Sequence, residues 1–303
     1  MRRQILIFLI ILLILFTGCA INDNTPEQSS GLKTFDPDKT NEPERNTSPE
    51  RYMNTSGVTL KERFQTPDGF ERLAAQTGSF AEYLQNLPLK THGSKVKLYN
   101  GGEKSDSAYL AVVDFDLGDR DLQQCADSLI RLRAEYFYDQ NRLQEIHFNF
   151  TNGFNADFNK WSQGYGIRVE GNDAYWVSNS QNDASKGSFK EYLDIVYAYA
   201  GTLSLEAELK KKDTEDMQIG DVFIRGGSPG HCIIIADMAK NQAAGETIFM
   251  LAQSYMPAQD IQILKNPDSS SEYYNTQWYP LDFGDTLITP EWTTGRNTLK
   301  SWE

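Results

Sequence analysis

The sequence predicts one globular domain of the α+β class with an antiparallel sheet. Amphipathic helical segments are concentrated before Lys212, and apolar strand-like segments separated by turn residues dominate after it. Such a separation of helices from strands is typical of α+β proteins. Residues 58–303, about 245 positions, have a globular composition and no internal repeat, which is enough chain for one large core.

Residues 1–18 have the pattern of a bacterial lipoprotein signal peptide. Arg2 and Arg3 are followed by the apolar run Ile5–Phe16, which is shorter than the roughly 20 residues of a membrane-spanning helix. The run ends at Gly18 and Cys19, and this end resembles the lipobox, in which the cysteine receives a lipid. An ordinary secretory signal that ends near a cysteine is the alternative. We expect Cys19 to anchor the protein in the cell envelope, facing outside the cytoplasm.

Residues 19–57 are expected to form a flexible tether. They are rich in Asn, Asp, Glu, Thr, Ser and Pro, so they cannot bury enough apolar surface to offset the entropy of ordering. Cleavage after Gly18 removes two arginines and no acidic residue, which moves the net charge from -13 to -15. This acidity argues against nucleic acid as a partner and against adsorption to anionic lipids. The membrane is therefore expected to be contacted through the lipid anchor only.

Helices and strands are expected in the following order. Ser79 is the expected N-cap of a short helix that ends at Leu87. Asp119 or Asp121 is expected to open a long helix with one apolar stripe that ends near Tyr138. Two more helices are expected, one capped by Ser188 and ending at 199, the other over 204–211. Strands are expected over 96–99, 109–115, 145–150, 166–169, 221–224, 231–237, 247–252 and 260–264.

Cys125, on the long predicted helix, is a candidate nucleophile. The partial positive charge of a helix N-terminus lowers a thiol pKa, and a histidine commonly takes the proton of such a cysteine. The alternative is a structural cysteine, because Cys125 shares the apolar stripe with Leu122 and Leu129 and free cysteines are usually buried. If Asp119 is the cap, Cys125 lies past the first turn and the helix dipole stabilises a thiolate less.

His231 and Gln253 are the candidate partners of Cys125. His231 follows a glycine-rich connection and begins a strand, where an imidazole is partly solvated and can titrate near neutral pH. The hairpin geometry places Gln253 directly opposite His231, about 5 Å away on the same face, where it would orient the imidazole. Ser254 and Tyr255 replace it if the register slips. A surface histidine and a glutamine that satisfies backbone groups are the alternatives.

Cys125 could instead pair with Cys232, because disulfides form in oxidising compartments. Successive residues of a strand face opposite sides. If His231 faces Cys125, then Cys232 is expected to face away from it. The catalytic triad and the disulfide are therefore expected to exclude each other.

No metal or cofactor is expected. The three histidines and the two cysteines other than Cys19 are scattered singly, without the spacing of a zinc site. Trp161 and Tyr165 lie in a glycine-containing segment and are candidates for lining a sugar or peptide groove, with a core or rim position as the alternative.

Five segments resemble the family catalogued as domain of unknown function 4846. These are Asp121–Tyr136, His147–Gly153, Tyr199–Leu205, Gly226–His231 and Ala252–Asp260. The resemblance extends over most of the chain from about Thr59 and implies no particular activity, because the family is uncharacterised.

A cysteine on a helix, a Gly-Asp strand and then Gly-His at the start of the next strand resemble NlpC-type and papain-like cell-wall hydrolases. This resemblance implies a papain-like arrangement, in which the Cys-bearing helix packs on an antiparallel sheet. It also implies that Cys125 attacks an amide in peptidoglycan peptides, with His231 as base and Gln253 as orienter. It requires an insertion between Cys125 and His231, and the usual Asp-Cys-Ser is absent. A non-catalytic binding or scaffold lipoprotein with the same fold is the alternative function.

Overall fold

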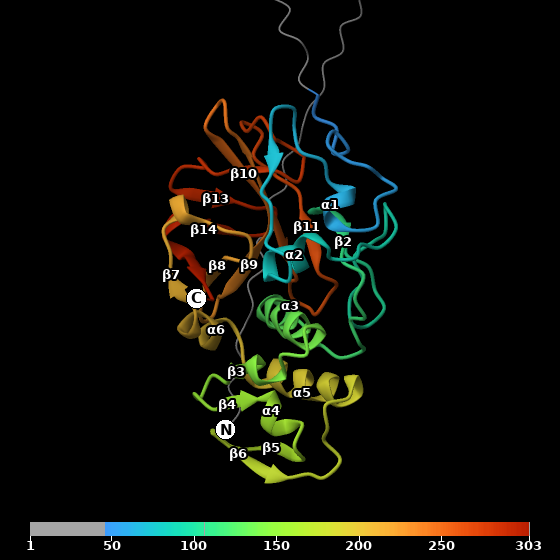
Figure 1. Ribbon diagram of the computed structural model, residues 1–303, viewed down its shortest axis with the longest axis vertical. Coiled ribbons are helices and arrows are strands. Elements are labelled where there is room, and N and C mark those ends of the chain that lie inside the picture. The colour runs from blue at the N-terminus through green and yellow to red at the C-terminus, as the bar shows by residue number, and fades with distance from the viewer. Residues whose placement is uncertain (1–45, 106, 303) are drawn as a thin grey trace, which may run out of the picture. The chain divides into compact units, whose positions relative to one another are not determined.

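The computed structural model describes residues 46–105 and 107–302, which form a mixed α+β structure (Figure 1). The predicted signal peptide, Cys19 and the first part of the predicted tether lie outside the described residues. Residues 46–57 are hydrogen-bonded to the domain: the Asn54 amide donates to Arg63 O at 2.7 Å, and the Gln65 amide donates to Tyr52 O at 2.8 Å. Contact with the domain thus begins before the predicted boundary at residue 57.

A nine-stranded antiparallel sheet lies at the centre of the described chain. The strand order is β2-β11-β10-β9-β8-β15-β7, with β1 paired to β9 and β12 paired to β10. The bounds are β1 (Glu71–Arg72), β2 (Tyr109–Val112), β7 (Lys210–Lys211), β8 (Val222–Arg225), β9 (His231–Asn241), β10 (Glu246–Gln253), β11 (Gln262–Leu264), β12 (Tyr279–Pro280) and β15 (Leu299–Ser301). The long hairpin β9–β10 is the middle of this sheet, and its apolar residues are buried on both faces.

Six α-helices are present in the described chain, α1 (Leu60–Arg63), α2 (Phe80–Gln85), α3 (Cys125–Asp139), α4 (Phe158–Trp161), α5 (Lys186–Tyr199) and α6 (Thr202–Glu208). Ser79 caps α2 as predicted, because its side chain accepts a hydrogen bond from the Glu82 amide. The cap of α5 is Ser185 rather than Ser188. After Lys212 the described helices are the short 3-10 turns Thr214–Asp216 and Arg296–Thr298.

The predicted start of α3 at Asp119 or Asp121 is wrong. The helix begins at Cys125, and Gln124 precedes it with an extended backbone. The reason is local: the Asp127 carboxylate reaches back and accepts the Gln124 amide hydrogen at 3.0 Å, which caps the helix at this point. Cys125 is therefore the first helical residue.

Three small hairpins complete the strands. They are β3 (His147–Asn149) with β4 (Asn155–Asp157), β5 (Tyr165–Glu170) with β6 (Asp173–Ser178), and β13 (Thr286–Ile288) with β14 (Thr293–Gly295). The strand predicted over 96–99 does not form; only isolated bridges occur there, Lys97 with Glu103 and Leu98 with Gln259.

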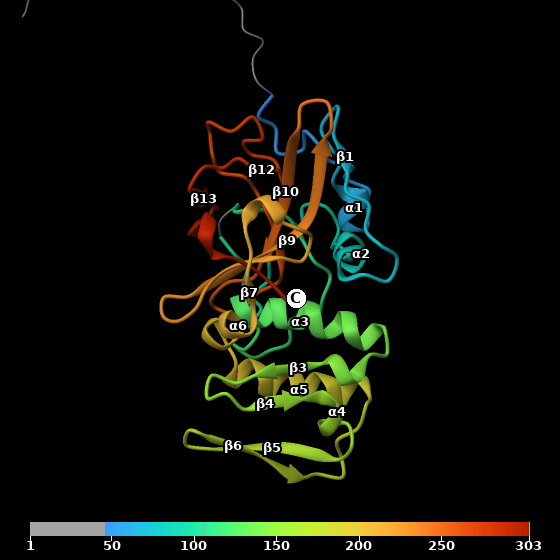
Figure 2. The same ribbon diagram turned by 60° about the vertical axis from the view of Figure 1, so that its left-hand side comes forward.

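α3 lies between the sheet and a layer formed by the chain from β3 to α5 (Figures 1 and 2). Along β9, side chains alternate between two cores, as a strand requires. Cys232 and Ile234 belong to the core on the α3 side, and Ile233 and Ile235 belong to the core on the other face of the sheet. This packing brings the start of α3 to the start of β9. No helix in the described part of the chain is long and apolar enough to cross a membrane.

Candidate active site

Cys125 occupies the N-terminal position of α3, where a thiolate is stabilised best. The Ala126 amide hydrogen-bonds the Cys125 sulfur, and the helix dipole adds partial positive charge at the same place. The residue is 8% exposed. A sulfur that is mostly shielded from water but faces amide hydrogens can remain ionised inside the protein.

Two side chains from the start of β9 contact this sulfur. Hydrogen bonds from the Cys232 thiol and from the His231 imidazole, together with the imidazolium charge, lower the pKa of Cys125 from 9.0 to about 5. Burial acts in the opposite direction but is outweighed. Burial raises the pKa of Cys232 well above its usual value, so Cys232 stays protonated and can donate its hydrogen. The site therefore holds a thiolate beside a neutral thiol.

The prediction that Cys232 faces away from Cys125 is wrong. Cys232 points toward α3 with its strand neighbour Ile234, and His231 still reaches the sulfur because it stands at the very end of β9. At the end of a strand, beside the last hydrogen-bonded residue pair, a side chain can turn out of the usual alternation between the two faces. Cys125 and Cys232 are both free thiols. A triad and a disulfide are thus not excluded by strand geometry.

Gln253 is in hydrogen-bond contact with His231, with 2.8 Å between Gln253 Oε1 and His231 Nε2. Its register differs from the predicted one. Ala252 pairs with Ile234, so Gln253 continues opposite Ile233 rather than opposite His231. A bulge between Met250 and Leu251 shifts the pairing by one residue, so that Gln253 lies opposite Ile233 instead of Ile234. The contact is diagonal across the hairpin, and it survives because a shift of two residues keeps side chains on the same face.

Ser254 and Tyr255, the predicted replacements for Gln253, make other contacts. The Ser254 hydroxyl donates to Gln259 O at 2.8 Å. The Tyr255 ring packs edge-on against the His231 imidazole, with 5.0 Å between ring centroids. Tyr255 therefore helps to fix the imidazole plane but does not hydrogen-bond in place of Gln253.

Glu291 and Trp292 are site residues that the sequence did not reveal. Gln253 Nε2 donates to Glu291 Oε2 at 2.8 Å, 38 positions further along the chain. The Trp292 ring lies 5.2 Å from the His231 ring between centroids. Both residues belong to the turn between β13 and β14, a separate small hairpin. No period or motif links this turn to His231, so only the folded structure could find them.

A groove of about 510 Å³ opens beside Cys125 and His231. Its walls are the start of α3, the end of α5, the loop before β9, Tyr255, Met256 and Trp292. Gly230 is required at its floor, because a Cβ there would lie 2.3 Å from Gly227 O. Grooves of this size accommodate small ligands and short peptide segments.

Trp161 and Tyr165, the predicted groove residues, do not line this groove. Trp161 is buried in the core, and its indole N–H donates to Ser188 Oγ at 2.9 Å. Tyr165 is 40% exposed at the start of β5, in the layer on the far side of α3. The chain from β3 to β6, which carries both residues, packs on the side of α3 away from the main sheet (Figures 1 and 2).

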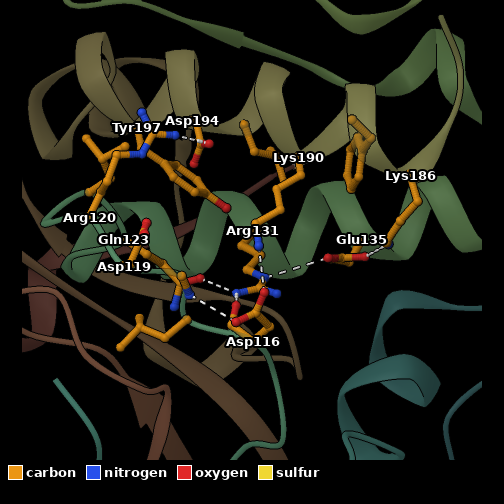
Figure 3. A pocket seen from close by; sticks show the side chains of 15 residues that line it. Asp116, Asp119, Arg120, Gln123, Arg131, Glu135, Lys186, Lys190, Asp194 and Tyr197 are labelled. Carbon is orange, nitrogen blue, oxygen red and sulfur yellow. Dashed lines mark hydrogen bonds and ion pairs between the residues drawn. The ribbon is translucent and has the colours of Figure 1, made fainter. Parts of the chain in front are cut away.

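A second cavity of about 260 Å³ lies between α3 and α5 and is lined by charged side chains (Figure 3). Ion pairs within the lining join Arg120 to Asp194, Lys190 to Asp116, and both Arg131 and Lys186 to Glu135. The cavity has no cysteine, serine or histidine in its lining. Within residues 46–105 and 107–302 no group of three His, Cys, Asp or Glu side chains is placed to hold a metal ion.

Comparisons with known proteins place the chain in one family. No curated protein and no solved structure matches it significantly. The profile of the family described as Domain of unknown function (4846) matches residues 60–301, which is most of the chain and includes Cys125, His231 and Gln253. The protein is therefore a member of the family Domain of unknown function (4846).

Proposed function

We propose that this protein is a lipid-anchored cysteine hydrolase that cleaves an amide bond outside the cytoplasm. Cys125 is the nucleophile, His231 the general base, and Gln253 the residue that orients the imidazole. One observation carries the proposal: the Cys125 sulfur, at the first position of α3, is hydrogen-bonded by an imidazole whose Nε2 is held by Gln253 at 2.8 Å. The packing of α3 against β9 supports a papain-like arrangement.

The reaction follows from these positions. The Cys125 thiolate attacks the amide carbon, and a C–S bond forms while the carbonyl oxygen becomes an oxyanion. The Cys125 backbone N–H, at the start of α3, is suited to bind that oxyanion. The imidazolium then gives its proton to the leaving amine as the C–N bond breaks. His231 next takes a proton from water, which attacks the thioester and releases a carboxylic acid and the thiolate.

Peptidoglycan stem peptides are the proposed substrate class. A lipid on Cys19 would hold the domain in the envelope, where the cell-wall peptides are. The groove beside Cys125 is about 510 Å³, enough for a few residues of an extended peptide.

A non-catalytic binding lipoprotein is the second candidate. The observation that favours it is burial, since Cys125 is 8% and His231 only 2% exposed. In that case the groove would bind a ligand without cleaving it.

Hydrolysis of purified stem peptides by the full chain tests the proposal, with new free amines as the readout. Cys125→Ser keeps the shape of the site but replaces the thiolate by a neutral hydroxyl. We expect this change to lower turnover by roughly a thousandfold or more. Lys190→Gln is the matched control, because Lys190 pairs with Asp116 in the second cavity. Equal turnover by wild type and Cys125→Ser, or peptide binding without any cleavage, would exclude the hydrolase.

A further inference from the structure

The Gln253 amide connects His231 to a carboxylate of another hairpin. Its Oε1 lies 2.8 Å from His231 Nε2, and its Nε2 donates to Glu291 Oε2 at 2.8 Å. Gln253 is fully buried, so water does not compete for either end of the amide. Both ends are therefore engaged by protein groups alone.

The two ends of an amide have opposite hydrogen-bonding roles, and their orientation decides what His231 can do. An ionised carboxylate only accepts hydrogen bonds, so the end of Gln253 that faces Glu291 must be its NH2 group. The oxygen is then the end that faces His231, and Nε2 must carry a hydrogen. Because Nε2 is engaged by Gln253, Nδ1 is the ring nitrogen left for the Cys125 sulfur.

We propose that Glu291 is a positioning residue for the triad: it fixes the Gln253 amide so that His231 keeps its proton on Nε2 and presents Nδ1 to Cys125. This inference rests on the proposed function. Glu291 is not among the residues that line the groove; it reaches His231 through Gln253. If the amide reversed, its NH2 would face Nε2–H, which disfavours the imidazolium that pairs with the thiolate.

Glu291 is itself held in place by an ion pair with Lys104. Lys104 Nζ lies 2.5 Å from Glu291 Oε2 and 3.3 Å from Gln262 Oε1, and the Lys104 side chain is only 7% exposed. Lys104 also lies over the Tyr255 ring, 5.9 Å from its centroid, and Tyr255 packs against His231. The lysine therefore joins the carboxylate to the aromatic wall beside the imidazole.

The test is the pH dependence of Cys125 alkylation in Glu291→Gln. A glutamine has nearly the same shape, but its amide can donate as well as accept, so Gln253 is free to reverse. We expect the midpoint of the alkylation profile to rise by about one pH unit, which means about tenfold slower alkylation at low pH. Glu145→Gln is the matched control, because Glu145 forms a half-exposed pair with Arg142 far from the groove. Its profile should equal that of the wild type.

The variant His231→Ala distinguishes a failure of this inference from a failure of the proposed function. If His231→Ala shifts the profile and Glu291→Gln, folded by circular dichroism, does not, the role of Glu291 is refuted and the triad stands. If neither variant shifts the profile, the proposed function fails with it.

The imidazole tautomer provides a second readout that needs no change at Glu291. In the Cys125→Ala chain labelled with ¹⁵N-histidine, His231 has no thiolate partner, and its neutral form should show the proton on Nε2. The three histidines of the sequence are distinguished by the loss of one signal set in His231→Ala. A proton on Nδ1 would contradict the proposed orientation of Gln253, even if Glu291→Gln did not fold.

Discussion

Cys125 owes its acidity to two side chains that are neighbours in sequence. The Cys232 thiol and the His231 imidazole both hydrogen-bond its sulfur, and they lower its pKa to about 5 against the effect of burial. Because the folded pKa lies below the usual 9.0, ionisation of Cys125 stabilises the folded state fully above pH 9. This contribution is lost as the pH falls toward 5.

Replacing Cys232 tests whether this residue acts on Cys125 as a hydrogen-bond donor or only by packing against it. Cys232→Ser keeps a donor beside the sulfur, so the pKa of Cys125 should stay near that of the wild type. Cys232→Val fills the space without a donor, and we expect the pKa of Cys125 to rise by about one unit or more. The pH dependence of alkylation, with Cys125 identified by peptide mass spectrometry, measures both. A valine variant with the wild-type midpoint would show that Cys232 does not tune the thiolate.

At the scale of elements, α1 and β1 are fastened to the central hairpin by a buried ion pair. Arg72 Nε lies 2.6 Å from Asp237 Oδ2, and the Asp237 side chain has no exposed area. Arg72 also donates to Lys61 O and Phe64 O of the α1 region, and Gln85 of α2 donates to Asp237 Oδ1 at 2.8 Å. One carboxylate of β9 thus holds three elements that precede it by more than a hundred residues.

Arg72→Met should destabilise the protein, because it leaves the Asp237 carboxylate buried without its charge partner. Removing one partner of a buried pair costs about 3–5 kcal/mol. Since Arg72 is 23% exposed and Gln85 remains, we expect the lower end, about 3 kcal/mol. The urea midpoint of unfolding measures the loss. Adding Asp237→Asn should recover part of it by removing the buried charge, and a single variant as stable as the wild type would refute the role of this pair.

Local patterns predicted the strands better than the helix starts. The apolar runs of β8, β9, β10 and β11 are bounded by turn residues, so their positions agree with the expected ones to within a few residues. The start of α3 was missed because Asp127 caps the helix from inside its first turn, which places Gln124 at the cap although glutamine is not a usual cap residue.

At the scale of the whole molecule, the contacts that make the site are long-range. The predicted pairing of the hairpin placed Gln253 on the same face of the sheet as His231, and this is correct although the observed register differs from the predicted one. The contribution of Glu291 and Trp292 could not be predicted, since they reach the site through a hairpin outside the main sheet. Trp161 was misplaced for the same reason: nothing in the sequence says on which side of α3 the chain from β3 to β6 packs.

The proposed lipid anchor should determine whether the whole protein is found at the membrane. The net charge after cleavage is strongly negative, so the domain itself should not adhere to anionic membranes. Cys19→Ala should therefore move the protein from the membrane fraction to the soluble extracytoplasmic fraction and abolish its labelling by a fatty-acid probe. Protein that stays with the membrane in this variant would argue against the lipid as the anchor.

The pH dependence of Cys125 alkylation by iodoacetamide, in the wild type and in His231→Ala, measures whether His231 activates the thiol. We expect a wild-type midpoint near pH 5, because Cys232 and His231 stabilise the thiolate, and a higher midpoint in His231→Ala. A midpoint between about 8 and 9 that is the same in both proteins would be that of an ordinary thiol. That result would contradict the meeting of sulfur and imidazole on which the proposed chemistry depends.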